Sequence, residues 1–404
     1  MPTPNIVLLS IQENVLVFIS GFGIMQAVFL AALLIFHPRS DRFVNVFLAL
    51  YISALAIPMM LPIAQRVFNW QIMVFIEPFL TLIGPMLYLY VRSHKETINF
   101  QKAWPHFVLF FLCIPLAVYN YRTIGLRFPP STAIPTVVAK NPSLLLPISI
   151  RLVQRVIYYI LASRALTSYQ RSIRHLFSDT SRIDLRWVRW LVNGNLFLIF
   201  VTVFFYVFMI RYPEYFDWWV LLPSVIVSLY IYMATIRGVT QLTLWQVQPG
   251  VSKEKVEEKM QEAEEIEALN ELPAKSLREA SLGSAKMDEV AARIIVLMEK
   301  DKLYQEPELT LLDLATKLQL PSYQVSQAIN LSLNKTFYDL INRYRVDEAK
   351  RLLLDARTAN YTILSVGFEA GFNSKTTFNT VFKKITGLTP TDFRKREVHS
   401  FSLD

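Results

Sequence analysis

Seven apolar runs, each close to 20 residues long, follow one another through the first 240 residues of the chain. Since the hydrocarbon core of a bilayer is about 30 Å thick, an α-helix needs roughly 20 apolar residues to cross it. A soluble core helix can be this apolar singly, but seven in succession predict a transmembrane helix bundle. The runs lie at residues 15–36, 43–63, 71–91, 104–120, 144–163, 188–210 and 218–236.

The loops between these runs predict the orientation of the bundle. Loops one, three and five carry ten Lys and Arg residues, whereas loops two, four and six carry five. Because positively charged loops stay in the cytoplasm, we expect the N-terminus outside the inner membrane and the C-terminal part inside. The first run is not expected to be a cleaved signal peptide, since no Lys or Arg precedes it.

Composition argues against most enzymatic chemistry. The 404 residues are 53% hydrophobic with a net charge of +9, and Cys113 is the only cysteine. A disulfide within the chain and a cysteine metal site are therefore excluded, and the five histidines show no spacing typical of metal ligands. The sequence also lacks a phosphate-binding P-loop, a dinucleotide glycine fingerprint and a nucleophile elbow. We therefore expect no metal, no cofactor and no enzymatic activity.

Charged residues also fall inside the apolar runs, where a charge is costly. Glu77 lies in the third run, and Arg151 and Arg155 lie four apart on one helix face of the fifth. They could form an internal ion pair that fixes two helices. They could instead line an outward-open pocket that binds an anionic small-molecule signal. A third interpretation starts the fifth span later and leaves Arg151 among the lipid headgroups.

The composition changes abruptly after Arg237, and residues 241–284 read as a charged helical linker. Apolar residues of helical period follow one another between residues 252 and 272, with charge around them. They are Val256, Met260, Ala263, Ile266, Leu269 and Leu272. Two interpretations are equally supported: a solvated spacer, or a short coiled coil that joins two chains as a homodimer.

Residues 285–404 read as a helical domain that begins with a first helix-turn-helix. Thr310 and Asp313 form a capping box before one amphipathic helix, and Leu320-Pro321 turns the chain into a second. That second helix is expected to point Tyr323, Ser326, Gln327 and Asn330 outward. A long helix at about 337–354 follows, which at 1.5 Å per residue spans roughly 27 Å.

A second and clearer helix-turn-helix occupies residues 361–396. Thr362 can cap a short helix that Gly371 ends, and Asn373 or Ser374 can cap the next, which Gly387 stops. Phe378, Val381, Phe382 and Ile385 make one apolar stripe of that helix. Basic and hydroxyl side chains occupy its other faces. Two helices joined by a tight glycine turn, the second outwardly basic, are typical of a DNA-binding unit.

At these residues the chain resembles the AraC/XylS family of transcription activators. The matching elements are Gly371-Phe372, Asn373-Ser374, Phe378, Phe382-Lys383-Lys384, Gly387, Thr389-Pro390 and Phe393-Arg394. The resemblance covers about residues 286–396 and implies two recognition helices joined by the long helix, double-stranded DNA as ligand and RNA polymerase as partner. The spacing of about 34 Å between successive major grooves suits such a rod.

The resemblance also implies roles for individual residues. Those expected to face the bases are Tyr323, Ser326, Gln327, Lys375, Thr376 and Thr380. Those expected to contact phosphates are Lys335, Lys383, Lys384, Arg394 and Lys395. The chain departs from the family in its first unit, where Ser326-Gln327-Ala328-Ile329-Asn330 replaces the usual Ser-Arg-x-Phe-Lys and weakens phosphate attraction. Asn334 replaces a glycine at a left-handed turn.

The sequence therefore predicts an all-α protein: a seven-helix bundle in membrane lipid, a helical linker and a cytoplasmic AraC-type domain. Its predicted function is that of a membrane-bound transcription regulator which couples a signal sensed by the bundle to promoter binding. Two alternatives stay open. One is a receptor or small-molecule transporter whose tail binds a protein partner, although paired halves are not visible. The other is an enzyme acting on lipid, for which Glu77 alone is weak support.

Overall fold

The protein is all-helical, as predicted. A computed structural model describes residues 4–37, 41–60, 63, 77–124, 145–180, 183–212, 215–240, 260–261 and 284–401. Within these ranges no strand forms, and the β-type pairing consists of an isolated antiparallel bridge between Phe177 and Thr310. The chain divides into two compact units, Met1–Thr167 with Leu185–Gln246, and Ser168–Asp184 with Val247–Asp404.

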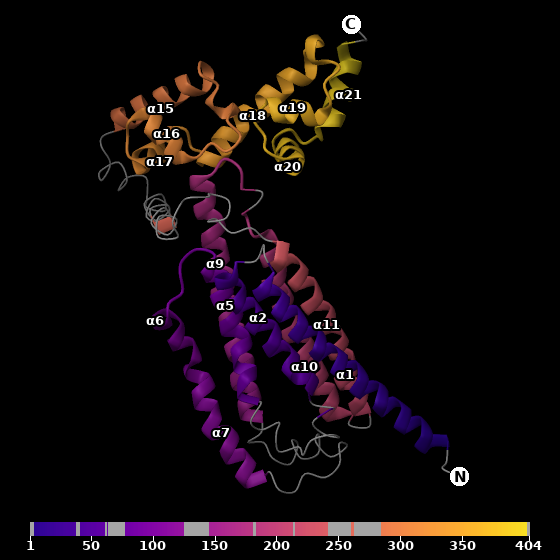
Figure 1. Cartoon of the computed structure of the whole chain (residues 1–404). Helices are drawn as coiled ribbons and strands as arrows, with labels where there is room; N and C mark the ends of the chain where they lie inside the picture. Colours follow the sequence, from indigo (N-terminus) through magenta and orange to yellow (C-terminus); the bar gives the residue numbers. More distant parts are fainter. Residues whose placement is uncertain are drawn as a thin grey trace. The chain divides into compact units, whose positions relative to one another are not determined.

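The first unit is a bundle of long apolar helices. Its α-helices are α1 (Pro4–Phe36), α2 (Arg42–Ala56), α5 (Ile83–Ser93), α6 (Phe100–Ala103), α7 (Val108–Ile124), the larger part of α9 (Leu145–Leu176), α10 (Arg186–Arg211) and α11 (Phe216–Thr240). Its 3-10 helices are η1 (Ile57–Met60), η2 (Glu77–Leu82) and η3 (Trp104–Phe107). Helix α1 packs against α2 and α11, and α10 packs against α11, so these helices lie side by side (Figure 1).

Five helical segments of the described chain are long and apolar enough to cross a membrane, so the predicted count of seven is not confirmed. The five lie at Val17–Phe36, Arg42–Met60, Phe100–Tyr119, Arg186–Phe208 and Leu221–Thr240. The predicted third run is described only from Glu77 onward, where η2 leads into α5. The predicted fifth run forms the first half of α9, a 32-residue helix that continues well beyond it.

A hydrogen-bonded polar cluster lies inside the bundle. The Tyr51 hydroxyl lies 3.2 Å from Oδ1 of Asn195 and 2.9 Å from the Tyr230 hydroxyl, which is 2.6 Å from the Leu191 carbonyl. These groups come from α2, α10 and α11, and all three side chains are buried. A buried polar group without partners is costly, so these contacts favour the packing of the three helices against one another.

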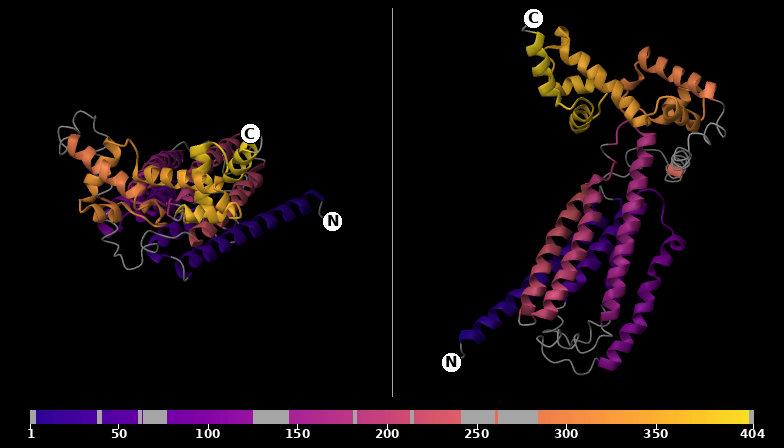
Figure 2. Two further views of the ribbon diagram at one scale, coloured as in Figure 1. Left: turned by 90° about the horizontal axis from the view of Figure 1, so that it is seen from above. Right: turned by 180° about the vertical axis from the view of Figure 1, so that it is seen from behind.

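The second unit holds two helical halves joined by one long helix. The first half contains α15 (Ser284–Glu299), η7 (Leu303–Gln305), α16 (Leu311–Leu318) and α17 (Ser322–Leu331). The connecting helix is α18 (Phe337–Leu354). The second half contains η8 (Ala356–Thr358), α19 (Ile363–Glu369), α20 (Lys375–Thr386) and α21 (Pro390–Phe401). Seen from behind in Figure 2, the two halves flank α18 at its two ends.

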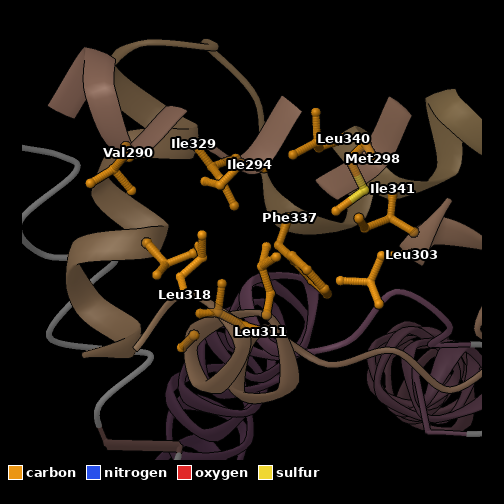
Figure 3. Close-up of a cluster of buried hydrophobic side chains, with 14 of the residues drawn as sticks. Val290, Ile294, Met298, Leu303, Leu311, Leu318, Ile329, Phe337, Leu340 and Ile341 are labelled. Atoms are coloured by element: carbon orange, nitrogen blue, oxygen red, sulfur yellow. The ribbon is translucent and has the colours of Figure 1, made fainter. Parts of the chain in front are cut away.

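Each half has its own hydrophobic core, and α18 contributes to both. In the first half, Ile294, Leu311 and Leu318 pack with Phe337 and Ile341 from the start of α18 (Figure 3). In the second half, the far end of α18 supplies four of the buried residues. That core consists of Val346, Ala349, Leu352, Leu353, Val366, Ala370, Phe372, Phe378, Val381 and Phe382.

The helix ends of the second unit follow the predicted signals. Thr310 and Asp313 form the capping box of α16, and the Thr362 side chain caps α19. Asn334 takes a left-handed backbone with φ 50°, as expected where glycine is replaced. The linker at residues 241–284, with its predicted coiled-coil stripe at 252–272, lies outside the described residues apart from 260–261 and Ser284.

Candidate nucleic-acid interface

Helix α20 is held by local signals at both ends and by its apolar stripe. The Ser374 hydroxyl accepts a hydrogen bond from the Thr377 amide at 3.1 Å, which caps the N-terminus. Gly387, with φ 79°, ends the helix in the left-handed conformation. Phe378 and Phe382 are at most 1% exposed and face the core shared with α18 and α19. The opposite face of α20 must therefore face solvent.

That outer face is basic and rich in hydroxyl groups. The side chains predicted to contact DNA from α20 are all at least partly exposed: Lys375, Thr376, Thr380, Lys383 and Lys384. Lys384 lies 3.4 Å from the Asp339 carboxylate of α18, an exposed ion pair that a phosphate can replace at little cost. The face therefore offers cationic donors and hydroxyls together, which suits phosphates and base edges.

A shallow, open hollow of about 620 Å³ lies between α20 and the start of α21. The residues that line it all have polar or charged side chains: Asn379, Thr380, Lys383, Lys384, Thr389 and Thr391. The Thr389 hydroxyl accepts from the Asp392 amide at 3.2 Å, which begins α21 there. Asn379 and Thr391 were not assigned to the site from the sequence, although Asn379 lies one helical turn from both Thr376 and Lys383.

Arg394, which is predicted to contact a phosphate, makes a hydrogen bond within the domain. Its Nη1 donates to the Tyr361 carbonyl at 2.9 Å, and its Nε and Nη2 are buried with no hydrogen-bond partner among the described residues. Through Nη1 the guanidinium joins α21 to Tyr361, the residue before the cap of α19. Lys395, one position further along α21, is exposed, and its phosphate contact stays a prediction.

The three residues of the first half that are predicted to face the bases differ in exposure. Tyr323 is 42% exposed, but Ser326 and Gln327 are only 2% and 7% exposed and cannot reach base edges in this conformation. The physical reason is that α17 packs against both α15 and α16, so five consecutive residues, 325–329, are buried around its circumference. Lys335 is half-buried just beyond the helix.

Arg345 on α18 was not singled out from the sequence, yet it is a structural centre of this unit. Its guanidinium is fully buried and donates from Nε to the Tyr304 carbonyl at 2.7 Å and from Nη2 to the Glu306 carbonyl at 2.7 Å. Burial lowers the pKa of Arg345 to about 10, and the nearby Asp179 carboxylate opposes this shift. The side chain therefore stays charged at neutral pH and ties α18 to the η7 segment.

The charged residues predicted within the apolar runs are only partly described. Arg151 and Arg155 lie one turn apart on α9 and are both half-buried. Glu77 begins η2, but its side chain lies outside the described set, so an ion pair or a ligand pocket stays a prediction. Among the described residues, no cluster of His, Cys, Asp or Glu could hold a metal ion.

Comparison with known proteins agrees with the geometry of the second unit. Residues 314–396 match the helix-turn-helix domain family. A 74-residue stretch is 38% identical to an uncharacterized HTH-type transcriptional regulator from the cgkA 5' region of Pseudoalteromonas carrageenovora. That stretch is 18% of this chain and 41% of the relative's length, so the similarity covers less than half of either protein. No solved structure matches the chain.

Proposed function

We propose that this chain, whose C-terminal part is a helix-turn-helix domain of the AraC type, is a membrane-held transcription regulator that binds specific DNA sequences. The observation that carries the proposal is the capped helix α20, whose apolar side is buried and whose exposed side presents lysines and threonines. A recognition helix needs this division, because one face must hold its orientation while the other enters the major groove.

In this proposal α20 reads the bases and the neighbouring hollow holds the backbone. Lys375 near its N-terminus can donate to guanine O6 and N7, and Thr376 and Thr380 offer a hydroxyl and a methyl group. Lys383, beside the start of α21, can contact a phosphate together with Lys395. Lys384 can exchange Asp339 for a phosphate. These phosphate contacts set the register of the protein on the DNA and its affinity, but they do not read the base sequence.

The first half makes fewer of the proposed base contacts than the second half. Helix α18 has 18 residues, which corresponds to about 27 Å, so a helix at each end can approach successive major grooves about 34 Å apart. In the described conformation α17 presents Tyr323 but not Ser326 or Gln327. The first half therefore contributes one exposed candidate base contact, whereas α20 contributes three.

The membrane part of the proposal rests on the surface of the first unit. Large apolar side chains on α1 and α10 are exposed, among them Phe18 at 74%, Phe29 at 66% and Phe200 at 65%. Water disfavours so much apolar surface, whereas lipid accepts it. We place these helices in the inner membrane with the DNA-binding part in the cytoplasm and the N-terminus outside. A small-molecule signal, RNA polymerase contact and a homodimer through 252–272 belong to the same proposal.

The test is a selection of genomic DNA fragments by the full-length chain in lipid nanodiscs at near-physiological salt. We expect a shared motif with two half-sites about one helical turn apart. Lys375→Ala should relax the base preference at one position of the motif. Lys383→Ala should weaken the affinity for all DNA sequences alike. Lys300→Ala is the matched control, because Lys300 is an exposed lysine at the end of α15 and outside the interface.

Two outcomes would contradict the proposal. If the retained DNA fragments share no motif, the proposal of sequence-specific DNA binding is contradicted. Retention of no DNA, together with stable capture of a cytoplasmic protein by the same nanodiscs, would favour a receptor or transporter with a protein-binding tail.

A further inference from the structure

A short segment between α9 and α10 belongs to the same compact unit as the DNA-binding domain, although it lies well over a hundred residues earlier in the sequence. The Ser178 amide and hydroxyl both donate to the Leu309 carbonyl, at 3.2 and 2.6 Å. Its neighbour Phe177 pairs with Thr310 in the isolated antiparallel bridge. The segment therefore binds the backbone immediately before α16, in the first half.

The same segment binds the connecting helix. Nδ2 of Asn342 donates to the Ser178 carbonyl at 2.9 Å, and Nη2 of Arg345 donates to the Ser178 hydroxyl at 3.1 Å. Ser178 and Arg345 are both fully buried. A buried guanidinium is tolerated only when its donors are bonded and its charge is balanced, and Ser178 and Asp179 supply part of both.

The segment also reaches the recognition helix of the second half. The Thr377 hydroxyl on the first turn of α20 donates to the Asp179 carboxylate at 3.3 Å. A carboxylate at the N-terminal turn of a helix is electrostatically favourable. Two consecutive residues, Ser178 and Asp179, therefore touch the first half, the connecting helix and α20.

The base of this loop is closed by its own hydrogen bonds. The Tyr169 hydroxyl donates to the Ile183 carbonyl at 2.8 Å, and Nε2 of Gln170 donates to the Asp184 carbonyl at 2.7 Å. These bonds join the last turns of α9 to the residues that lead into α10. The loop is therefore held by hydrogen bonds at its base, and Ser178 and Asp179 bond to the domain.

We propose that the α9–α10 loop is a docking partner of the DNA-binding domain which fixes the orientation of its two halves. This inference rests on the proposed function. The loop clamps the domain without covering its reading surface, since Lys375, Thr376 and Thr380 stay accessible while Asp179 is bonded to Thr377. Binding of DNA at two half-sites depends on how the two halves of the domain are placed relative to each other. The loop, through Ser178 and Asp179, sets that placement and acts as a clamp.

The first experiment tests the docking by disulfide formation in the full chain in nanodiscs. In a Cys113→Ala background, which has no other cysteine, the pair Asp179→Cys and Thr377→Cys should crosslink under mild oxidation. The control pair joins Asp179→Cys with Thr391→Cys on α21, and it should stay reduced. After cleavage at a protease site introduced within 241–283, a crosslink keeps the two fragments together on a non-reducing gel. Equal crosslinking of both pairs, or of neither, would overturn the docking.

The second experiment tests the consequence for DNA binding. Ser178→Ala removes a hydroxyl that accepts from Arg345 and donates to Leu309, so affinity for DNA with both half-sites should fall about 10-fold. Affinity for a single half-site read by α20 should change less than about twofold, because one half needs no clamp. Arg174→Ala, an exposed change one turn earlier on α9, should leave both affinities as in the wild type.

The outcomes separate this inference from the function on which it rests. Unchanged binding of Ser178→Ala to the two-site DNA, or an equal loss on both DNAs, would overturn the clamp while leaving the regulator intact. If the wild-type chain binds no DNA, but the variant with Asp179→Cys and Thr377→Cys still forms its disulfide selectively, the proposed function is overturned and the docking is retained.

Discussion

Gly371 and Gly387 offer a paired test of how closely the two halves of the DNA-binding domain approach each other. Both have a left-handed backbone, with φ of 94° and 79°. A Cβ at Gly371 would lie 2.5 Å from the Tyr304 carbonyl oxygen and 2.7 Å from Cα of Gln305, both backbone atoms of the first half. A Cβ at Gly387 would meet nothing within 4 Å. The destabilisation caused by Gly371→Ala should therefore differ from that caused by Gly387→Ala mainly through this steric clash.

The expected magnitudes follow from those two contributions. A left-handed alanine costs about 1–2 kcal/mol, so Gly387→Ala should destabilise the domain by that amount. Gly371→Ala adds an overpacking cost of about 1–3 kcal/mol, because backbone atoms cannot rotate away. The Tyr304 carbonyl also accepts from Nε of Arg345, so moving it weakens that bond as well. We expect a total loss of about 2–5 kcal/mol for Gly371→Ala.

Hydrogen exchange of the full-length chain measures this loss within the domain itself. All seven tryptophans lie in residues 1–245, so tryptophan fluorescence does not report on the C-terminal unit. Exchange of core amides in α18 and α20 should accelerate roughly 30-fold or more in Gly371→Ala, and roughly 5- to 30-fold in Gly387→Ala. Equal acceleration by the two substitutions would refute the close approach of the halves at Tyr304.

Three further predictions concern single contacts of the same unit. Thr310→Ala removes the capping box of α16 and should cost about 1 kcal/mol, seen as faster amide exchange in α16. The Arg351 guanidinium, bonded to the Glu348 carboxylate at 2.8 and 2.9 Å, holds the pKa of Glu348 below its usual value. The stability from this pair is therefore present above about pH 4.5 and lost as pH falls through the lowered pKa, and Glu348→Gln should flatten that part of an acid-unfolding curve. Arg394→Lys should destabilise the domain but leave the salt dependence of DNA binding unchanged, whereas Lys383→Ala should reduce the salt slope by about one.

The elements predicted best from the sequence are those fixed by neighbouring residues. The long helix at 337–354 forms over that range, and Ser374 and Gly387 bound α20 as expected. Caps, left-handed turns and apolar stripes act within a few residues, so the sequence displays them directly. The exposed lysines and threonines of α20 follow from the same stripe, because the rest of the helix surface is left to solvent.

The surroundings of some predicted site residues depend on distant neighbours. Ser326 and Gln327 occupy positions that one amphipathic stripe leaves outward, but helices on two sides bury them. Arg394 matches a family motif, yet its flexible side chain bonds to the Tyr361 carbonyl 33 residues earlier. Local periodicity describes one face of one helix and contains no information about a second covering element.

Arg345 shows why the sequence could not predict which segments of the chain make up the DNA-binding unit. An arginine in a helix normally faces solvent, and nothing near residue 345 indicates that Ser178, 167 positions earlier, would bond to it. A fragment beginning at residue 285 would lose that bond and the Asp179 carboxylate, and would leave part of a buried guanidinium to water. If the loop is the clamp that we propose, such a fragment should bind the two-site DNA more weakly than the full chain, with the affinity for one half-site preserved. DNA recognition by this protein is therefore best measured with the helices of the first unit and the α9–α10 loop in place.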